Sequence, residues 1–391
     1  MNILFGILSL IVLVGIAYLF SENKKAVKFQ TIIAGILMQV VLIFFVIKIP
    51  IGQTILETLS NFVNHIIQLG MEGVEFVFGG ISDNYVFGIN VLALIIFTSA
   101  LISVLYYLRI IPFLIKYIGR SISFLMGTTG AETFSAVANS FLGGTEAPLV
   151  IKPFLAKLTR SELFAVMAAG FGSASAAILA GYAMMGIDMK YLLIAVFTVP
   201  FSCLMIAKVL IPETEESQTK EIELNRAESE SIFEAISEGT ANGLSLALNV
   251  GAMLIAFIGL IALVNAFLGL FGTSISTLLG YVFYPFGFLF NIPSNEIFTF
   301  ASLVGSKFAI NEFFAYSELV QYLDTLSPRT IGILSVVLCN FANISTIGIQ
   351  IGGFSSFAPS RKKEVTKLGM RALFAGTIAT LTTGAIVGMF L

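Results

Sequence analysis

The sequence predicts an all-α, polytopic membrane protein with eight transmembrane helices, two re-entrant helical hairpins and one interfacial helix. Of its 391 residues, 57% are hydrophobic and 11% are charged, whereas soluble domains carry about 25% charged residues. The mean hydropathy is +0.97, and apolar runs long enough to cross a bilayer recur along the chain. A net charge of −2 with scattered basic residues excludes a nucleic-acid-binding surface.

Eight apolar segments predict membrane spans, at residues 3–20, 29–48, 88–108, 162–186, 191–211, 240–268, 329–353 and 370–391. The first segment has no basic flank and no small-residue cleavage site, so we interpret it as a retained span rather than a signal peptide. Cys203 and Cys339 lie far apart in apolar runs. They predict neither a metal site nor a disulfide, and we expect them in the packed interior.

Two further apolar stretches, about 110–155 and 275–322, are broken by Gly, Pro, Asn and Glu and are poor through-spans. Irregular backbone is tolerated at membrane depth where it is buried in protein. We therefore expect each stretch to be a helical hairpin that enters the membrane and returns to the side from which it came.

The segment 51–80 has the pattern of a helix that lies in the membrane interface. Its polar residues recur every three or four positions and share one helix face, opposite an apolar face. That polar face holds Glu57, Asn61, His65, Gln68 and Glu72. His65 is the single histidine of the chain, and we place it on this wet face, with a catalytic or proton-relay role as the alternative.

The basic residues predict the orientation of the chain. If the N-terminus is outside and both hairpins return to their own side, all but four of the 21 Lys and Arg residues face the cytoplasm, in line with the positive-inside rule. The exceptions are Lys48, Lys190, Lys307 and Arg329. If 110–155 were a full span, the basic residues of 152–160 would move outside, so the charge bias favours re-entry.

An acidic segment at 212–234 is the only long polar stretch, and we interpret it as a solvated cytoplasmic linker. It divides the chain into halves, each with a broken hairpin followed by two spans, as in the inverted repeats of secondary transporters. The expected units are scaffold spans with the interfacial helix at 1–108, half of a transport core at 109–211, the linker at 212–234, a long scaffold span at 235–272 and the second core half at 273–391.

Few carboxylates lie in the apolar segments, and Glu146 and Glu312 stand out among them. A charge at the bilayer centre costs roughly 2.5–3.5 kcal/mol even on a lenient scale, so such residues usually line a site or a pathway. The alternative is that both lie in ordinary hairpin turns as buried, neutral carboxylic acids.

Both carboxylates follow a helix breaker or a capping residue. Gly143-Gly144 allows a turn before Glu146, with Thr145 as the expected N-cap and Pro148 in the first helical turn. Asn311 precedes Glu312 in the same way. Half-helix ends inside a membrane offer unpaired N–H and carbonyl groups, which suit a polar solute and a small cation.

Two predicted spans are also interrupted. The fourth contains a run of small residues, 172–177, and the seventh contains the polar run 340–346. Small residues also serve close helix packing, and this interpretation stays open for 172–177. The amides and hydroxyls of 340–346 indicate a pathway, and their oxygen atoms suit a polar organic solute and a hard monovalent cation.

Several motifs now give the chain a family resemblance. They are Gly-x-Thr-Glu-Ala-Pro-Leu at 143–149, Ser-Glu-Leu-Phe-Ala-Val-Met at 161–167, ALNVGAMLIAFIGLIALVN at 247–265, Asn-Glu-Phe-x-Ala-Tyr at 311–316 and Phe-Ala-Asn-x-Ser at 341–345. In this order, and over nearly the whole chain, the sequence resembles the concentrative nucleoside transporter family. The resemblance implies a homotrimer in the lipid bilayer, each protomer having a scaffold part and a mobile transport part.

The resemblance also implies site residues. Those for a nucleoside substrate fall at Gly144, Thr145 and Glu146 for the base and at Glu312, Asn343 and Thr346 for the ribose, with Phe341 and Ile178 at the pocket. The implied sodium ligands fall at Asn139, Leu142, Ser173 and Ala174.

Two positions depart from the family pattern. Thr346 replaces the common Ser and keeps a hydroxyl, whereas Gly144 replaces the common Gln and deletes a side chain that would touch the base. We therefore expect a wider base pocket that favours purine nucleosides and a shift toward uridine in Gly144→Gln. The alternative is that water fills the vacated volume and pyrimidine selectivity stays.

The function expected from these observations is cation-coupled nucleoside import across a bacterial inner membrane by alternating access, with sodium as the coupling ion and no cofactor. Proton coupling stays open, since Glu146 or Glu312 could carry a proton. The sequence contains no nucleophile–base pair or phosphate-binding loop, which argues against an enzyme. A gated channel for small polar solutes is the rival from another class.

Overall fold

Apolar helices form all the regular structure in the described residues, 1–81, 86–222 and 229–391 of the computed structural model. Among these residues, seven helical stretches are long and apolar enough to cross a membrane. A helix satisfies its backbone hydrogen bonds internally, as lipid surroundings require. The protein is therefore an all-α, multi-pass membrane protein.

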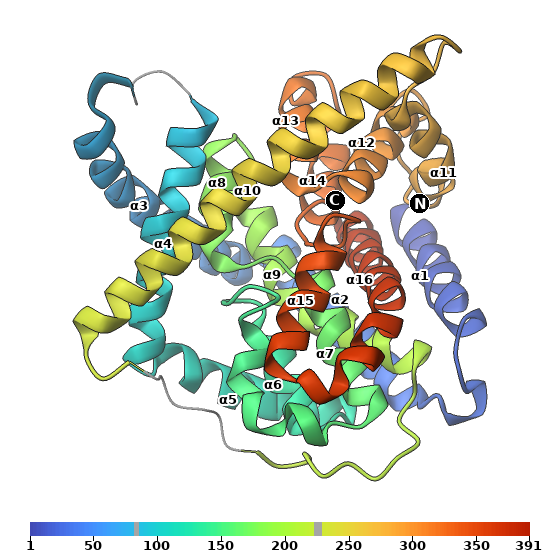
Figure 1. The fold of residues 1–391 in the computed structure, drawn as a ribbon. Helices are drawn as coiled ribbons and strands as arrows, with labels where there is room; N and C mark the ends of the chain where they lie inside the picture. The colour runs from blue at the N-terminus through green and yellow to red at the C-terminus, as the bar shows by residue number, and fades with distance from the viewer. Residues whose placement is uncertain (82–85, 223–228) are drawn as a thin grey trace.

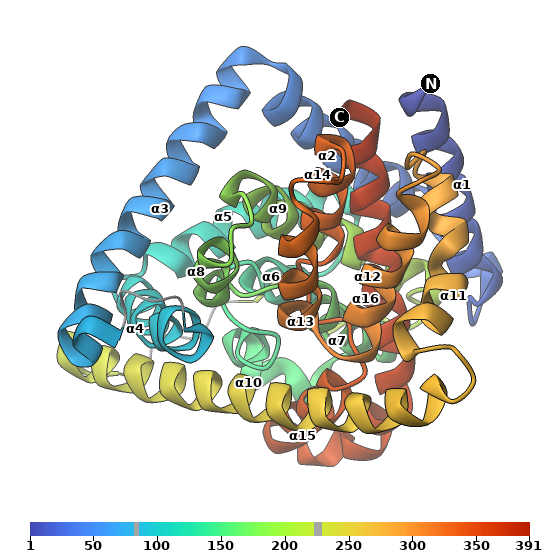
Figure 2. The ribbon, with the colours of Figure 1, turned by 90° about the horizontal axis from the view of Figure 1, so that it is seen from above.

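Five helices form an outer part in which few residues are buried in the protomer. They are α1 (Asn2–Leu19), α2 (Phe29–Lys48), α3 (Pro50–Phe78), α4 (Ala93–Tyr107) and α10 (Ile232–Gly269). In Figure 1 the long α10 crosses the molecule diagonally over α4. Figure 2 shows α3 and α10 running along two sides of an inner group of helices.

Small residues bring α10 close to α4. Gly239 and Gly243 lie four positions apart on the buried side of α10, in register with Ala235 and Ala247. A Cβ atom on Gly239 would lie 2.8 Å from the Ala100 Cα, and one on Gly243 the same distance from the Ile96 Cα. Small side chains at this spacing let two membrane helices pack backbone to backbone.

The segment predicted as an interfacial helix is the single helix α3, which begins at Pro50. The five polar residues of its predicted wet face are all exposed in the protomer, which agrees with that part of the prediction. One of them, Glu57, forms an ion pair with Lys190 at 3.2 Å.

Six helices form the inner part, and most of their residues are buried. They are α7 (Arg160–Gly172), α8 (Ala176–Met184), α9 (Met189–Leu210), α14 (Pro328–Val337), α15 (Thr346–Phe357) and α16 (Lys362–Phe390). The predicted spans 162–186 and 329–353 are both interrupted here, at 173–175 and at 338–345, as the sequence indicates. Cys203 and Cys339 are free and fully buried, as expected.

The two stretches predicted as hairpins are subdivided further than expected. The first contains α5 (Ile110–Met126), α6 (Gly130–Ala138) and a 3₁₀ segment (Ala147–Lys157), and the second contains α11 (Ile275–Leu289), α12 (Ile297–Ala309) and α13 (Glu312–Leu319). The remaining short elements are Lys24–Ala26, Gly79–Ile81, Gly88–Leu92, Val320–Tyr322 and Pro359–Arg361. The chain turns back at 139–146 in the first stretch and at 310–311 in the second.

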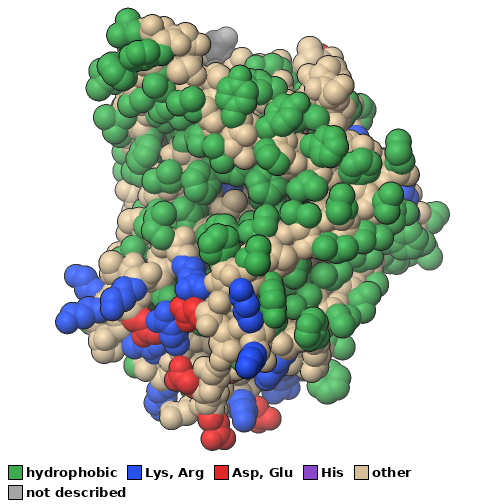
Figure 3. All heavy atoms as spheres, turned by 90° about the vertical axis from the view of Figure 1, so that its right-hand side faces the viewer, with side chains coloured by type: hydrophobic (Ala, Val, Ile, Leu, Met, Phe, Trp, Pro, Cys, Tyr) green, Lys and Arg blue, Asp and Glu red, His purple; other side chains and the backbone are tan. Residues whose placement is uncertain are grey.

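Charged side chains gather at one end of the molecule, whereas apolar side chains cover most of the rest of the face in Figure 3. Glu22, in the loop after α1, accepts hydrogen bonds from Arg160 and Arg371, both at 2.8 Å. The hydrogen bond from Arg160, together with the charges of both guanidinium groups, holds the pKa of Glu22 below its usual value. This network joins the loop after α1 to α7 and α16.

The acidic segment 212–234 is less solvated than expected in the part that the structure describes. The hydroxyls of Ser217 and Thr219 donate to the buried Glu162 at 2.5 and 2.7 Å, and Lys208 pairs with Glu132 at 2.6 Å beside them. Residues 212–222 therefore dock against α6, α7 and α9. The rest of the expected linker includes 223–228, which lies outside the described residues.

Candidate functional site

A cavity of about 410 Å³ lies where the two chain turns and the two helix breaks come together, and ligand sites commonly have volumes of this order. Seven of the eight predicted substrate residues line it: Gly144, Thr145, Glu146, Glu312, Phe341, Asn343 and Thr346. The eighth, Ile178, is fully buried in α8, and its neighbour Ala177 lines the cavity instead. Polar groups from α10, among them Asn242 and Asn249, complete the wall.

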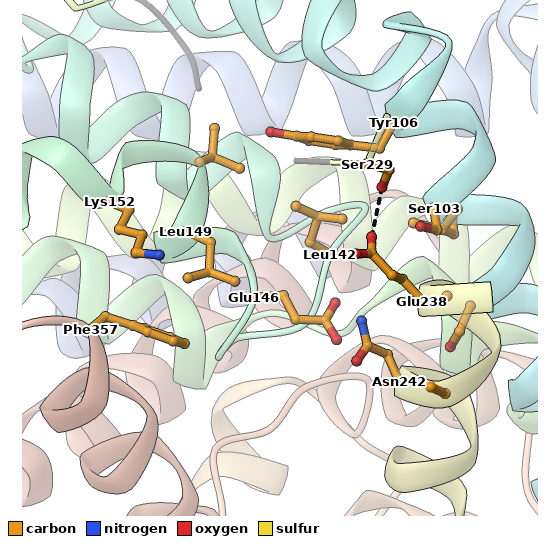
Figure 4. A pocket seen from close by; sticks show the side chains of 15 residues that line it. Ser103, Tyr106, Leu142, Glu146, Leu149, Lys152, Ser229, Glu238, Asn242 and Phe357 are labelled. Atoms are coloured by element: carbon orange, nitrogen blue, oxygen red, sulfur yellow. Dashed lines mark hydrogen bonds between the residues drawn. The ribbon is translucent and has the colours of Figure 1, made fainter. Parts of the chain in front are cut away.

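A second cavity of about 560 Å³ adjoins the first and shares Ser99, Glu146 and Asn242 with it. Figure 4 shows Glu146 and Asn242 pointing toward one another between its walls, with Tyr106 and Lys152 farther out. The Ser229 hydroxyl donates to Glu238 at 2.6 Å on the same wall. Glu146 therefore lies between two adjoining cavities.

Glu312 is only 4% exposed, and two hydrogen-bond donors hold its carboxylate in place. The Tyr182 hydroxyl donates to its Oε1 at 3.2 Å, and the Asn343 amide donates to its Oε2 at 3.1 Å. Asn311 caps α13, because its side chain accepts from the Phe314 N–H at 2.9 Å, as the sequence predicts. A carboxylate fixed in this way is a preorganised acceptor for a solute hydroxyl.

The amide of Asn343 organises the break between α14 and α15. Its Oδ1 accepts from the Ser345 hydroxyl at 2.6 Å and from the N–H and hydroxyl of Thr346 at 2.9 and 2.8 Å. Since its Nδ2 binds Glu312, this one amide joins α13 to the start of α15. The hydroxyl of Thr346 keeps its acceptor capacity toward the cavity.

The first turn differs in one detail from the expectation. The 3₁₀ segment begins after Glu146, which is its N-cap residue and forms no side-chain capping bond, so Thr145 is not the cap. The Gly143 N–H donates to the Glu146 carboxylate at 3.3 Å instead. Because the carboxylate closes the turn, the Thr145 side chain is left to line the cavity. Pro148 lies in the first turn, as predicted.

The space beside Gly144 is occupied, contrary to the expectation of a vacated volume. A Cβ atom on Gly144 would lie 2.5 Å from the Gly170 carbonyl oxygen and closer still to the Gln350 Nε2. Gln350 is 2% exposed and donates to that same carbonyl at 3.2 Å. The amide of Gln350, from α15, thus lies against Gly144, and Gly144→Gln has no room.

The four predicted cation ligands lie at the first turn and the first break. Asn139 and Ser173 are 0% and 2% exposed, and neither the Asn139 Oδ1 nor the Ser173 Oγ has a hydrogen-bond partner. Buried polar atoms are rarely left unpaired without a ligand, an ion or water. With the neighbouring residues Leu142 and Ala174, they form a neutral oxygen donor set that fits a hard monovalent cation better than a transition metal.

The two helix breaks are in direct contact. The Phe341 N–H donates to the Ser173 carbonyl oxygen at 3.0 Å. The Ile344 N–H donates to the Phe308 carbonyl, also at 3.0 Å, and the Ser345 hydroxyl donates to the Ile310 carbonyl at 3.1 Å. Ser173, one of the four predicted cation ligands, is therefore hydrogen-bonded to Phe341 in the wall of the cavity.

Sequence reasoning missed three residues that line this site or support it. Lys307, in the second expected hairpin, was counted among the basic residues on the outer side of the membrane, but it is 3% exposed and its ammonium binds Asn340. A lysine inside an apolar helix was the signal that could have found it. Tyr182 and Gln350 carry no comparable local signal, since each meets its partner across more than a hundred residues of chain.

The sequence matches three family profiles that together span most of its length. Residues 8–81 match "Na+ dependent nucleoside transporter N-terminus", residues 88–189 match "Nucleoside recognition" and residues 191–388 match "Na+ dependent nucleoside transporter C-terminus".

Similar proteins and structures cover the whole chain. "Uncharacterized transporter YutK" of Bacillus subtilis is 42% identical over 100% of both chains. "Nucleoside permease NupC" of Helicobacter pylori is 39% identical over 99% of this chain and 98% of its own. CNTnw in an inward-facing substrate-bound state is 39% identical, with a TM-score of 0.95 over 100% of this chain and 98% of its own. A CNTnw variant in an outward-facing state is 38% identical, with a TM-score of 0.96 over the same shares.

The packing at the first turn predicts unequal effects of two neighbouring alanine substitutions. Gly144→Ala should destabilise the protein by about 1–3 kcal/mol, because its Cβ would meet the Gly170 backbone at 2.5 Å. Gly143→Ala is the matched control, since its nearest neighbours, the carboxyl atoms of Glu146, lie 3.8 Å away. Thermal unfolding of both variants in detergent checks this, and equal melting temperatures would contradict the contact.

Proposed function

The chain belongs to the concentrative, Na⁺-dependent nucleoside transporter family, and from this membership we propose that it is a sodium-coupled nucleoside importer of a bacterial cytoplasmic membrane. The observation that carries the proposal is the direct contact between two sites. A cavity lined by Glu312 and Asn343 adjoins, through the Phe341–Ser173 hydrogen bond, a cluster of buried oxygens without donors. A carrier that couples an ion to a solute needs such a junction.

The proposed substrate contacts follow from the chemistry of the cavity. Glu312, Asn343 and Thr346 offer acceptors and a donor suited to ribose hydroxyls, with Phe341 beside them. Gly144, Thr145 and Glu146 face the base from the first turn. A carboxylate at Glu146 can accept a hydrogen bond from a base N–H group.

The proposed coupling site comprises Asn139, Leu142, Ser173 and Ala174. The Asn139 Oδ1 and the Ser173 Oγ have no hydrogen-bond partner, and sodium bound there would coordinate both. Because Leu142 directly precedes Gly143-Gly144, the ion would order the turn that faces the base. Solute and ion would then increase each other's affinity by the same factor.

The proposed architecture has eight spans, with α7–α8 and α14–α15 each counted as one broken span, and α3 lying in the interface. The turns at 139–146 and 310–311 are the tips of two re-entrant hairpins, and the two halves form an inverted repeat. The N-terminus lies outside, which puts the charged end of Figure 3 in the cytoplasm. A homotrimer, built on exposed apolar helices such as α10, would hold the scaffold while the inner part moves by alternating access.

Two rival functions remain in the proposal. A proton-coupled pyrimidine nucleoside symporter would use Glu146 or Glu312 as its proton carrier. A channel for small polar solutes would let solute equilibrate passively, without accumulation against a gradient. Enzymatic activity is not proposed, because the related proteins are transporters.

Base preference is the least constrained part of the proposal. The sequence argument for purine preference assumed an empty space beside Gly144, and it does not hold because Gln350 lies there. Purine nucleosides are still favoured on the size of the cavity, about 410 Å³, and on the second cavity of about 560 Å³ that adjoins it at Glu146. A volume of this size leaves room for a two-ring base.

Glu312→Gln should nearly abolish nucleoside uptake while leaving the assembled protein intact. The substitution keeps the shape but removes a charge-assisted acceptor that contributes roughly 1.5–3 kcal/mol. Uptake of labelled nucleoside into proteoliposomes measures the effect, with size-exclusion elution as the control for assembly. Near-normal uptake would remove Glu312 from the substrate site.

Replacing external sodium by choline should stop accumulation of nucleoside in the same proteoliposomes. The donor set at Asn139 and Ser173 is neutral and suits sodium. Unchanged uptake in choline that rises with an inward proton gradient would favour the proton-coupled rival, and equilibration without accumulation would favour the channel.

Excess inosine or guanosine should reduce uptake of labelled uridine at least as strongly as excess unlabelled uridine. The size of the cavity is the physical reason, so unlabelled ribose alone serves as a control that lacks the base. Uridine uptake that ignores both purine nucleosides would show a pyrimidine-selective site.

A further inference from the structure

Lys307 is a buried cation that the proposed site does not use. It lies on α12 and is 3% exposed. Its ammonium donates to the Asn340 Oδ1 and, at 2.9 Å, to the Ala342 carbonyl oxygen. Both partners are neutral oxygens of the break between α14 and α15. The ammonium is therefore surrounded in the way that a bound alkali cation is, by an amide oxygen and a backbone carbonyl.

The first half of the chain offers the same kind of oxygens without an ammonium. In that half, α6 ends directly before Asn139 and a turn follows it. Farther along the chain, α7 and α8 are separated by the break at 173–175. The Asn139 Oδ1 and the Ser173 Oγ are buried and have no donor. In the second half the arm α12, a turn, and the broken pair α14 and α15 follow in the same order, and Lys307 supplies the donor.

The network around Lys307 closes the second break. Asn340 donates through its Nδ2 to the Val337 carbonyl at 2.8 Å and accepts from the Ala342 N–H at 2.9 Å. Asn340 thus joins the Lys307 ammonium to the end of α14. Ala342 directly precedes Asn343, so Lys307 fixes the segment that presents Asn343 to Glu312.

We propose that Lys307 is a built-in cation, which does for the second helix break what the coupling ion does for the first. Sodium as that ion rests on the proposed function; the role of the ammonium rests on its own contacts. Lys307 is a positioning residue that acts through Asn340 and Ala342. The second break is thus assembled permanently, whereas the first is assembled only when an external cation arrives.

Three variants test the proposal. Lys307→Ser removes the ammonium and leaves space at the Asn340 and Ala342 oxygens, whereas Lys307→Met removes the charge but fills the space. Lys116→Met, on an exposed position of α5, is the matched control. Each purified protein is assayed in detergent for melting temperature and for nucleoside binding, with and without methylammonium.

We expect Lys307→Ser to melt at a lower temperature and to bind nucleoside at least tenfold more weakly than the parent protein. Methylammonium should restore its melting temperature and most of its affinity, because the small cation takes the place of the lost ammonium. It should not restore Lys307→Met and should not affect Lys116→Met. If Lys307→Ser aggregates, the yield of folded protein purified with and without methylammonium gives the same comparison.

Wild-type affinity in Lys307→Met would overturn the proposal, and so would equal losses in both variants with no effect of methylammonium on Lys307→Ser. The melting temperatures are measured without nucleoside, so they do not require a working substrate site. A parent protein that binds no nucleoside would therefore contradict the proposed function, while rescue of the melting temperature would still decide the role of Lys307.

Discussion

The hydrogen bond from the Phe341 N–H to the Ser173 carbonyl oxygen, 3.0 Å long, joins the two helix breaks on which the site depends. Each break frees backbone groups from helical hydrogen bonding, and in surroundings without water these groups need partners from the protein or a ligand. At the second break the side chains of Asn340 and Asn343 accept from the Ala342 and Thr346 N–H groups, and backbone carbonyls accept from most of the others. Polar groups of Glu312, Asn343 and Thr346 line the cavity, where a solute can pair with them.

The two halves satisfy the same requirement differently. Around the second break the chain provides its own donors, so Glu312 and Asn343 are fixed before any solute arrives. Around the first break two buried oxygens, on Asn139 and Ser173, have no donor. Under the proposed function, an ion that binds at the first break would satisfy these two oxygens, whereas the second break would stay as it is. In physical terms, coupling is then the completion of one hydrogen-bonding network.

Much of the site follows from local sequence, and the rest depends on contacts between distant segments. The polar run 340–346 and the Asn311 cap before Glu312 were predictable, because amides and capping residues have few other reasons to lie in apolar helices. Lys307 was misplaced because a count of basic residues assigns each one to a side of the membrane and does not allow for one buried in the interior. Gln350 was missed because its partner lies 180 residues away. Hydropathy also could not separate α5 and α11 from the arms that follow them, since amphipathic helices and hairpin arms have similar average composition.

The most direct test of this account is equilibrium binding of a nucleoside to the purified protein as a function of sodium concentration, in the parent protein and in Asn139→Ala. The account predicts that sodium tightens nucleoside binding in the parent, that the nucleoside tightens sodium binding by the same factor, and that Asn139→Ala loses this linkage while still folding. Nucleoside affinity that is independent of sodium in the parent protein would contradict it.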